Sequence, residues 1–115
     1  MKDGVYYMVF KSSLEAFGEG VLVICCGEVN GGDIGFVYQG ILDSPMMTLN
    51  IIRHHDDIPS ALGMERNYQL LMHYHSEQDG EYEMHGHVKG HPELTIEAHV
   101  RFLVPLVHAN TQCVE

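Results

Sequence analysis

The chain has 115 residues, with 16 Asp and Glu against 6 Lys and Arg, which gives a formal net charge of −10 at pH 7. A chain of this length is typical of a single domain, here 1–115, built around one closed core. The acidic balance and the lack of any basic run disfavour direct binding to nucleic acid or to an anionic membrane, and they favour a basic protein partner.

Short strand-like runs are separated by glycine, Asn-Gly, Asp-Gly and proline, and no long stretch has helical periodicity. The segment 56–63 interrupts this pattern, and its Gly63 limits any helix there to about one turn. The pattern predicts an all-β fold, an antiparallel up-and-down β-barrel of seven or eight strands with at most one short helical turn, and a β-sandwich is the rival. We expect the strands over residues 4–12, 19–28, 33–42, 46–54, 66–77, 81–89, 93–104 and, for a short last strand, 106–109.

The first two expected strands are apolar at nearly every position, in the runs Val5 to Phe10 and Val21 to Cys26. A strand that is apolar on both faces has a second cover, which is either another part of the barrel or another subunit. We favour a homodimer through this surface, with Leu22 and Ile24 among its contact residues. After the second strand, Asn30 and Gly31 tolerate the positive φ of a tight turn and predict a hairpin within residues 28–33.

Three cysteines do not make a disulfide framework. Cys25 and Cys26 are neighbours on a strand and point to opposite faces, so we expect two separate, buried thiols. Cys113 lies in the tail, where nothing nearby would activate a thiolate. Free thiols and the lack of an apolar signal segment predict a cytoplasmic protein.

Nine histidines are the most unusual feature of the composition. Two pairs, His73 with His75 and His85 with His87, have the spacing that places both rings on one strand face, where they would suit a metal ion. However, the histidines alternate with apolar residues and share their parity with acidic ones. A solvated ladder of charges is therefore the preferred interpretation, and a metal site is the alternative.

The turn at Gly80 predicts how these strands pair, because a three-residue loop with Gly80 left-handed keeps the two faces unmixed. In that register the outward pairs are Glu77 with Glu81, His75 with Glu83 and His73 with His85. If the next hairpin pairs Val88 with Leu94, then His85 meets Glu97, Glu83 meets His99 and Glu81 meets Arg101.

An eight-stranded barrel has an interior that is either filled by side chains or open to one small ligand. Bulky residues of the inward parity are the expected lining of a cavity for a small apolar ligand, or else simply core: Tyr68, Leu70, Met72, Tyr82, Met84 and Phe102.

The sequence contains no catalytic signature. No nucleophile elbow surrounds Ser44, Ser60 or Ser76. The cluster 54–57, His-His-Asp-Asp, carries metal-capable groups but reads better as a solvated loop. We therefore expect that the protein is not an enzyme and that it binds no cofactor and no metal ion.

Seven short segments, in order along nearly the whole chain, resemble the global-regulator-repressor family, the negative regulators of bacterial type III secretion. They are Met1-Lys2-Asp3-Gly4 with Tyr6, Gly18-Glu19-Gly20 with Leu22, Gly31-Gly32-Asp33-Ile34, Val37-Tyr38-Gln39-Gly40, Ile58-Pro59-Ser60 with Leu62, Tyr68-Gln69-Leu70, and Pro105-Leu106-Val107.

This resemblance implies a lipocalin-like barrel with a hydrophobic cavity, a homodimer, and repression without chemistry, by holding a transcriptional activator through protein contact. In the family, an acidic run in the loop after the Val-Tyr-Gln-Gly strand is implicated in that contact. The corresponding loop here is one residue shorter and has a single acid, so the contact does not carry over residue by residue. The predicted partner-binding residues are Asp43, Ser44 and Pro45. The alternative function is a carrier or sensor of a small, lipid-like ligand.

Overall fold

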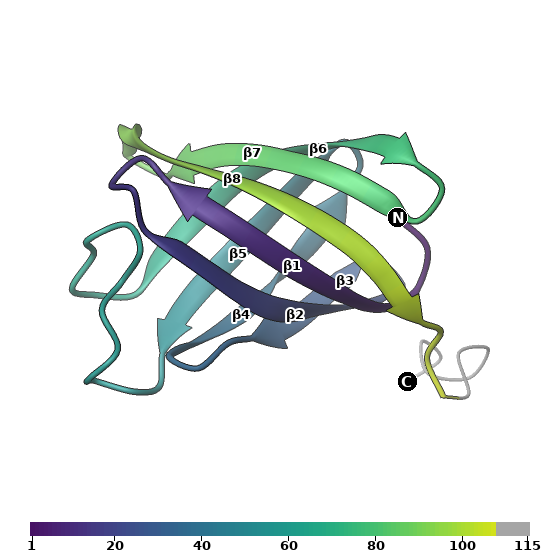
Figure 1. Ribbon diagram of the computed structural model, residues 1–115, viewed down its shortest axis with the longest axis horizontal. Coiled ribbons are helices and arrows are strands. Elements are labelled where there is room, and N and C mark those ends of the chain that lie inside the picture. Colours follow the sequence, from purple (N-terminus) through teal and green to yellow (C-terminus); the bar gives the residue numbers. More distant parts are fainter. Residues whose placement is uncertain (108–115) are drawn as a thin grey trace.

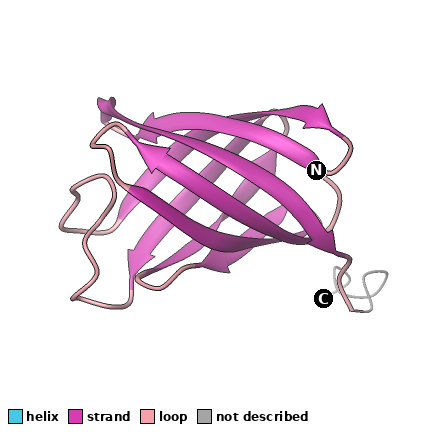
Figure 2. Ribbon diagram, in the orientation of Figure 1, coloured by secondary structure: helices cyan, strands magenta, loops and turns pink. Residues whose placement is uncertain are grey.

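The computed structural model describes residues 1–107 as eight antiparallel strands that close into one barrel, in which each strand pairs with its neighbours in sequence and β1 pairs with β8 (Figure 1). No helix occurs in this part of the chain (Figure 2). The predicted all-β up-and-down barrel is therefore confirmed. The strands are β1 (Gly4–Ser12), β2 (Phe17–Cys25), β3 (Glu28–Gly32), β4 (Phe36–Asp43), β5 (Met46–Arg53), β6 (Tyr68–Gln78), β7 (Glu81–Val88) and β8 (His91–Val104).

The barrel interior is formed by alternate residues of every strand, because successive side chains of a strand point to opposite faces. All eight strands contribute buried apolar side chains to one cluster, which includes Tyr6, Leu22, Val29, Met47 and Val100. Closure leaves no strand edge with unpaired backbone groups, which is the usual reason for an even, hairpin-linked strand series to form a barrel.

The first hairpin after β2 lies earlier than the sequence predicted. Cys26 and Gly27 have φ of 51° and 82° and make the turn, whereas Asn30 and Gly31 lie within β3. A Cβ on Gly31 would lie 2.0 Å from the carbonyl oxygen of Val21, so this glycine permits close approach of two strands. The expected hairpin within 28–33 was wrong because a strand glycine and a turn glycine look alike in sequence.

The side chains of Leu22 and Ile24 are 0% and 1% exposed and belong to the barrel core. Their placement on a dimer surface was therefore wrong, since a side chain buried within one subunit offers nothing to a second. The outward residues of the same strand are Val21, Val23 and Cys25, which are exposed or half-buried. The dimer itself stays a prediction.

The two ends of the barrel differ. One end carries the turn 13–16, the segment 33–35 and the long loop 54–67, which is teal and lies at the left in Figure 1. The Arg53 side chain holds this loop in place by donating to the carbonyl oxygens of Ile58 at 2.7 Å and Asp56 at 3.3 Å. The opposite end carries the N-terminus, the tight turns 26–27, 44–45 and 79–80, and the end of β8. Residues 106–107 are not in a strand, and the rest of the short strand expected over 106–109 lies outside the described residues.

Candidate functional site

A cavity of about 610 Å³ opens into the barrel at the end that carries the loop 54–67. Its volume is within the range of small-molecule sites in proteins. The wall is almost wholly apolar and comes from seven strands and from the loops of this end, including residues 58–61. It is lined by Met8, Phe10, Ala16, Phe17, Gly18, Glu19, Asp33, Ile34, Phe36, Tyr38, Leu49, Ile51, Ile58, Pro59, Ser60, Ala61, Tyr68, Leu70, Met72, Met84, Ile96 and Ala98.

The polar groups of the cavity lie at its mouth and have partners within the chain. The Asp33 carboxylate accepts the backbone N–H groups of Gly35 and Phe36, both at 2.9 Å, and the hydroxyl of Tyr38. Burial, reinforced by Asp33, holds the pKa of Tyr38 far above its usual range. Burial also raises the pKa of Tyr68, against a hydrogen bond with Ser60 that lowers it. Both tyrosines are therefore neutral hydrogen-bonding groups at physiological pH.

Two large apolar side chains stand at the rim of this mouth. Phe17 and Ile34 line the cavity yet are 74% and 73% exposed. Large exposed apolar side chains next to an apolar pocket are a common feature of binding sites. Neither residue was predicted as part of a site, because an isolated apolar residue beside a turn carries no periodic signal.

Four of the six residues predicted as interior lining do line the cavity: Tyr68, Leu70, Met72 and Met84. Tyr82 and Phe102 also belong to the barrel interior but pack at its other end. There the Tyr6 ring meets Tyr82 and Phe102 edge to face, with ring centroids 6.2 and 5.4 Å apart. Aromatic rings thus fill one end of the barrel and leave the other end hollow.

Met8, Phe10 and Leu49 line the cavity as well, although none of them was predicted as lining. The strand β1 is apolar on both parities, so alternation could not tell which set faces inward. Within the aromatic end, the Tyr74 hydroxyl is buried without a hydrogen-bond partner among residues 1–107.

The outer face of β6, β7 and β8 presents histidines and acids in the predicted alternation. The pairs His73 with His85, His75 with Glu83, His85 with Glu97 and Glu83 with His99 all occur. Two pairings were wrong because each hairpin contains a bulge. Gln78 rather than Glu77 stands opposite Glu81, and Val88 is opposite His91 rather than Leu94.

His99 connects two acids of this face. Its Nε2 lies 2.9 Å from a carboxylate oxygen of Glu81, and its Nδ1 contacts the carboxylate of Glu83. The hydrogen bond with Glu83, aided by that with Glu81 and opposed by partial burial, raises the pKa of His99. A hydrogen bond from Gln78, aided by His99, lowers the pKa of Glu81. These ion pairs are the solvated ladder that the alternation predicted.

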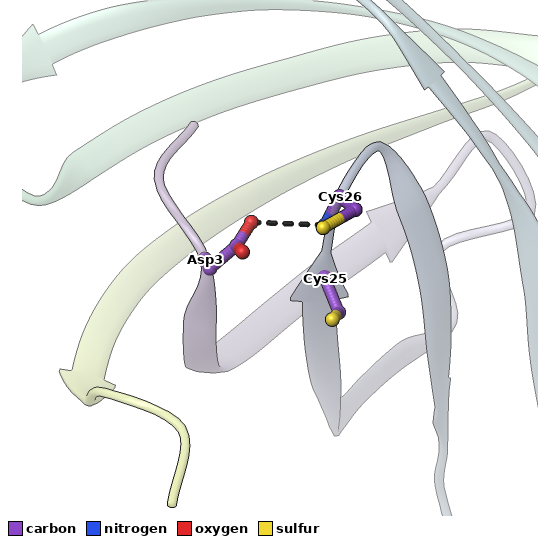
Figure 3. Close-up of side chains that lie close together, drawn as sticks. All are labelled: Asp3, Cys25 and Cys26. Carbon is purple, nitrogen blue, oxygen red and sulfur yellow. Dashed lines mark hydrogen bonds between the residues drawn. The ribbon is translucent and has the colours of Figure 1, made fainter. Parts of the chain in front are cut away.

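A metal site built from histidines is not supported within the described chain. The His73 and His85 rings stack with centroids 5.4 Å apart, but residues 1–107 contain one group of three metal-capable side chains, and it has no histidine. That group is Asp3, Cys25 and Cys26, whose ligand atoms lie within 4.8 Å of one another (Figure 3). The His-His-Asp-Asp cluster 54–57 does not form such a group either.

The chemistry of Asp3, Cys25 and Cys26 does not suit a metal ion. Cys26 is disulfide-bonded, so its sulfur is not a thiolate ligand, and burial raises the pKa of the Cys25 thiol. The Asp3 carboxylate accepts the backbone N–H of Cys26 at 3.1 Å and so stabilises the turn after β2 (Figure 3). The prediction of two separate, buried thiols was wrong, because Cys25 is a half-buried free thiol and Cys26 is exposed at a turn and disulfide-bonded. Cys113 lies outside the described residues.

The predicted partner-binding residues form a tight turn between β4 and β5. Asp43, Ser44 and Pro45 are all exposed, with a cis peptide bond between Ser44 and Pro45. The Pro45 carbonyl accepts the backbone N–H of Tyr74 at 2.9 Å, which joins the turn to β6. This turn lies at the end of the barrel opposite the loop 54–67, where the cavity opens.

Comparison with models of known protein families gives a match over nearly the whole chain. The model of a family described as the T3SS negative regulator GrlR matches residues 1–105. No curated protein matches the chain. None of the described residues forms a helix long and apolar enough to span a membrane.

Proposed function

Because the chain belongs to the GrlR family of negative regulators of the type III secretion system, we propose that it represses by holding a transcriptional activator through direct protein contact, without catalysis. The observation that carries this proposal is the distribution of charge. Acids gather on the outward side of β6–β8 and the turns between them: Glu77, Asp79, Glu81, Glu83, Glu93 and Glu97. Such a surface repels the phosphates of DNA and attracts a basic protein.

The acidic outer face of β6–β8 supplies the negative charge that the short turn 43–45 lacks. The turn offers a single carboxylate, on Asp43. The outer face offers several on rigid, paired strands, where a partner meets them without ordering a loop. The turn then contributes the edge of the contact rather than its main charge.

The test measures repression and binding together. The variant Glu77→Gln/Glu97→Gln removes two charges from the outer face, and a second variant, Asp43→Asn, removes the charge of the turn. Glu28→Gln is the matched control, because Glu28 is exposed and lies on β3, away from this face. Each variant is assayed for repression of a type III secretion promoter and for capture of the purified activator.

We expect the double variant to lose repression and at least about tenfold in affinity for the activator, since charges at an interface contribute to both rate and specificity. The control should behave as the unaltered protein. Equal repression by all variants, with no capture of the activator by any of them, would overturn the proposed contact.

A second function is supported by the cavity: the barrel carries or senses a small apolar ligand. Ala98 is buried and lines the cavity, so Ala98→Phe would place a ring in the space that a ligand needs. The purified protein, sprayed under native conditions into a mass spectrometer, should retain a small apolar molecule that Ala98→Phe lacks. An empty barrel in both proteins, after purification without detergent, would argue against this second function.

A further inference from the structure

We propose that the cavity takes a single-chain amphiphile whose head group is uncharged or cationic, and that it rejects anionic head groups such as a fatty-acid carboxylate. This inference rests on the second proposed function, that the cavity binds a ligand, and it adds the class of that ligand. It follows from the acidic charge at the mouth, from the partners of Arg53 and Lys11, and from the apolar wall, whose polar groups already have hydrogen-bond partners.

The ionised groups among the described residues of the cavity lining are all acidic. The lining contains no lysine, arginine or histidine, and the carboxylate at its mouth is that of Asp33, beside the buried Tyr38. Glu19 also contributes to the lining, but its carboxylate accepts the Tyr7 hydroxyl on the outer face of the barrel. An anionic head at the mouth would lose water without gaining a cationic partner, and it would stand near a fixed negative charge. A cationic head would be attracted by the same charge.

Two basic side chains at this end of the barrel, Arg53 and Lys11, are already bound to other groups. The Arg53 guanidinium donates to the carbonyl oxygens of Asp56, Ile58 and Met64, at 3.3, 2.7 and 3.4 Å. These bonds hold the loop 54–67 over the barrel end, so a ligand that took the guanidinium would release the loop.

Lys11 stands outside the rim and is engaged as well. Its ammonium is 3.1 Å from the Glu15 carboxylate and 5.5 Å from the centre of the Phe17 ring. The pair of Lys11 and Glu15 has no net charge, so it does not create a positive mouth.

Deeper in the cavity, the wall suits a hydrocarbon chain. The side chains there are Met8, Leu49, Leu70, Met72 and Met84, which form no hydrogen bonds and adapt to the shape of a flexible chain. The Tyr38 hydroxyl is occupied by Asp33. A ligand therefore gains by burying an apolar tail and needs only one polar group, at the mouth.

The experiment compares three probes with the same ten-carbon chain: decyltrimethylammonium, 1-decanol and decanoate. Each is titrated into the full chain by calorimetry below its micelle-forming concentration, at about pH 8, where the decanoate carboxylate is ionised. We expect the cationic and neutral probes to bind, and decanoate to bind at least about tenfold more weakly.

Variants assign the selectivity to the mouth. Asp33→Asn keeps an oxygen for the N–H groups of Gly35 and Phe36 but removes the charge. It should therefore strengthen the binding of decanoate and weaken the binding of the cationic probe, while the affinity for decanol stays unchanged. Ile34→Lys, at an exposed position of the rim, adds a positive charge, so it should shift the binding of the probes in the same direction and serves if Asp33→Asn does not fold. Glu28→Gln, at the opposite end of the barrel, should change nothing.

Two results would overturn the inference, and only the second would also rule out the ligand-carrying function. Decanoate binding as tightly as decanol would refute the head-group selectivity but retain the ligand site. Binding of none of the three probes would remove the ligand-carrying function together with its selectivity.

Discussion

At the scale of single residues, His99 is the clearest example of a side chain whose protonation is linked to folding. Its hydrogen bonds with Glu83 and Glu81 raise its pKa above the ordinary value of 6.5. The stability that it contributes is therefore fully present below about pH 6.5, where the unfolded chain is also protonated, and is lost as the pH rises through the raised folded pKa. Glu81 acts in the opposite sense, since its pKa is lowered and its contribution is lost as the pH falls through that folded value.

We expect His99→Gln to lower the melting temperature most between about pH 5 and 6, and to lower it less as the pH rises above neutrality. Thermal melts of both proteins across this range measure the difference. His87→Gln, on the same face, is the control. A difference between His99→Gln and the unaltered protein that stays constant from about pH 5 to 9 would contradict the link between His99 protonation and stability.

Gly40 shows how one position can depend on the absence of a side chain. A Cβ there would lie 1.8 Å from the carbonyl oxygen of Thr48 on the neighbouring strand, and backbone cannot move aside cheaply. We expect Gly40→Ala to cost about 1–3 kcal/mol of unfolding free energy or more, measured by urea denaturation. Gln39→Ala, the exposed neighbour, should cost less than about 1 kcal/mol. Equal losses for the two variants would mean that the strands separate freely at this point.

At the scale of elements, β2 separates a core face from an outer face although both are apolar. Leu22 is fully buried, whereas Val21 is 39% exposed. We expect Leu22→Ala to cost about 2–5 kcal/mol, as a cavity-forming core substitution does, and Val21→Ala to cost less than about 1 kcal/mol. Urea denaturation of the two variants compares the faces directly. A loss for Val21→Ala as large as that for Leu22→Ala would mean that burial within one subunit does not distinguish the two faces of β2.

The same strand carries the proposed dimer surface, now assigned to outward side chains. Val5 is paired with Val23, and Tyr7 with Val21, across β1 and β2, which makes a continuous apolar outer surface. We propose that a second copy of the chain covers it, and we expect Val21→Glu to convert a dimer into a monomer with little loss of unfolding free energy. Light scattering after size-exclusion chromatography measures the mass. A dimer that survives Val21→Glu would place the interface elsewhere.

At the scale of the whole molecule, the net charge of −10 makes electrostatic attraction the dominant long-range force between this barrel and a basic partner. Salt screens such attraction within a few ångströms at high ionic strength. We expect the affinity for the activator to fall at least about tenfold between about 0.05 and 0.5 M NaCl, mainly through the association rate. Surface-based kinetics with the purified activator measure both rates. An affinity that does not change with salt would indicate an apolar contact instead of the acidic outer face of β6–β8.

The two proposed functions use separate places on the barrel: the interior for a ligand, and the outer face of β6–β8 with the turn 43–45 at its edge for a protein partner. The cavity opens among the turn 13–16 and the loop 54–67, whereas the turn of Asp43, Ser44 and Pro45 lies at the aromatic end. A ligand and a protein at the turn would therefore not compete for the same surface. Any influence of one on the other has to pass through the strands of the barrel.

The sequence by itself determined the architecture and the surface of the last three strands. The alternation through His73, Glu83 and Glu97 assigns one parity to water, and the left-handed Gly80, with φ of 77°, sets the register of the hairpin. Alternation and turn glycines are local signals, so they can be read without the rest of the chain. These local signals were sufficient to predict the barrel, the ladder of histidines and acids on β6–β8, and four of the residues that line the cavity.

Only the tertiary structure decided the remaining features, because they depend on which strand or side chain lies opposite a given residue. Where both parities are apolar, as in β2, closure of the barrel selects Leu22 for the core and leaves Val21 outside. Whether a glycine makes a turn or admits a neighbouring strand, as at Gly31, depends on the strand beside it. The cavity exists because aromatic rings fill one end of the barrel while the other is covered only by a loop, and no local pattern records that difference in volume.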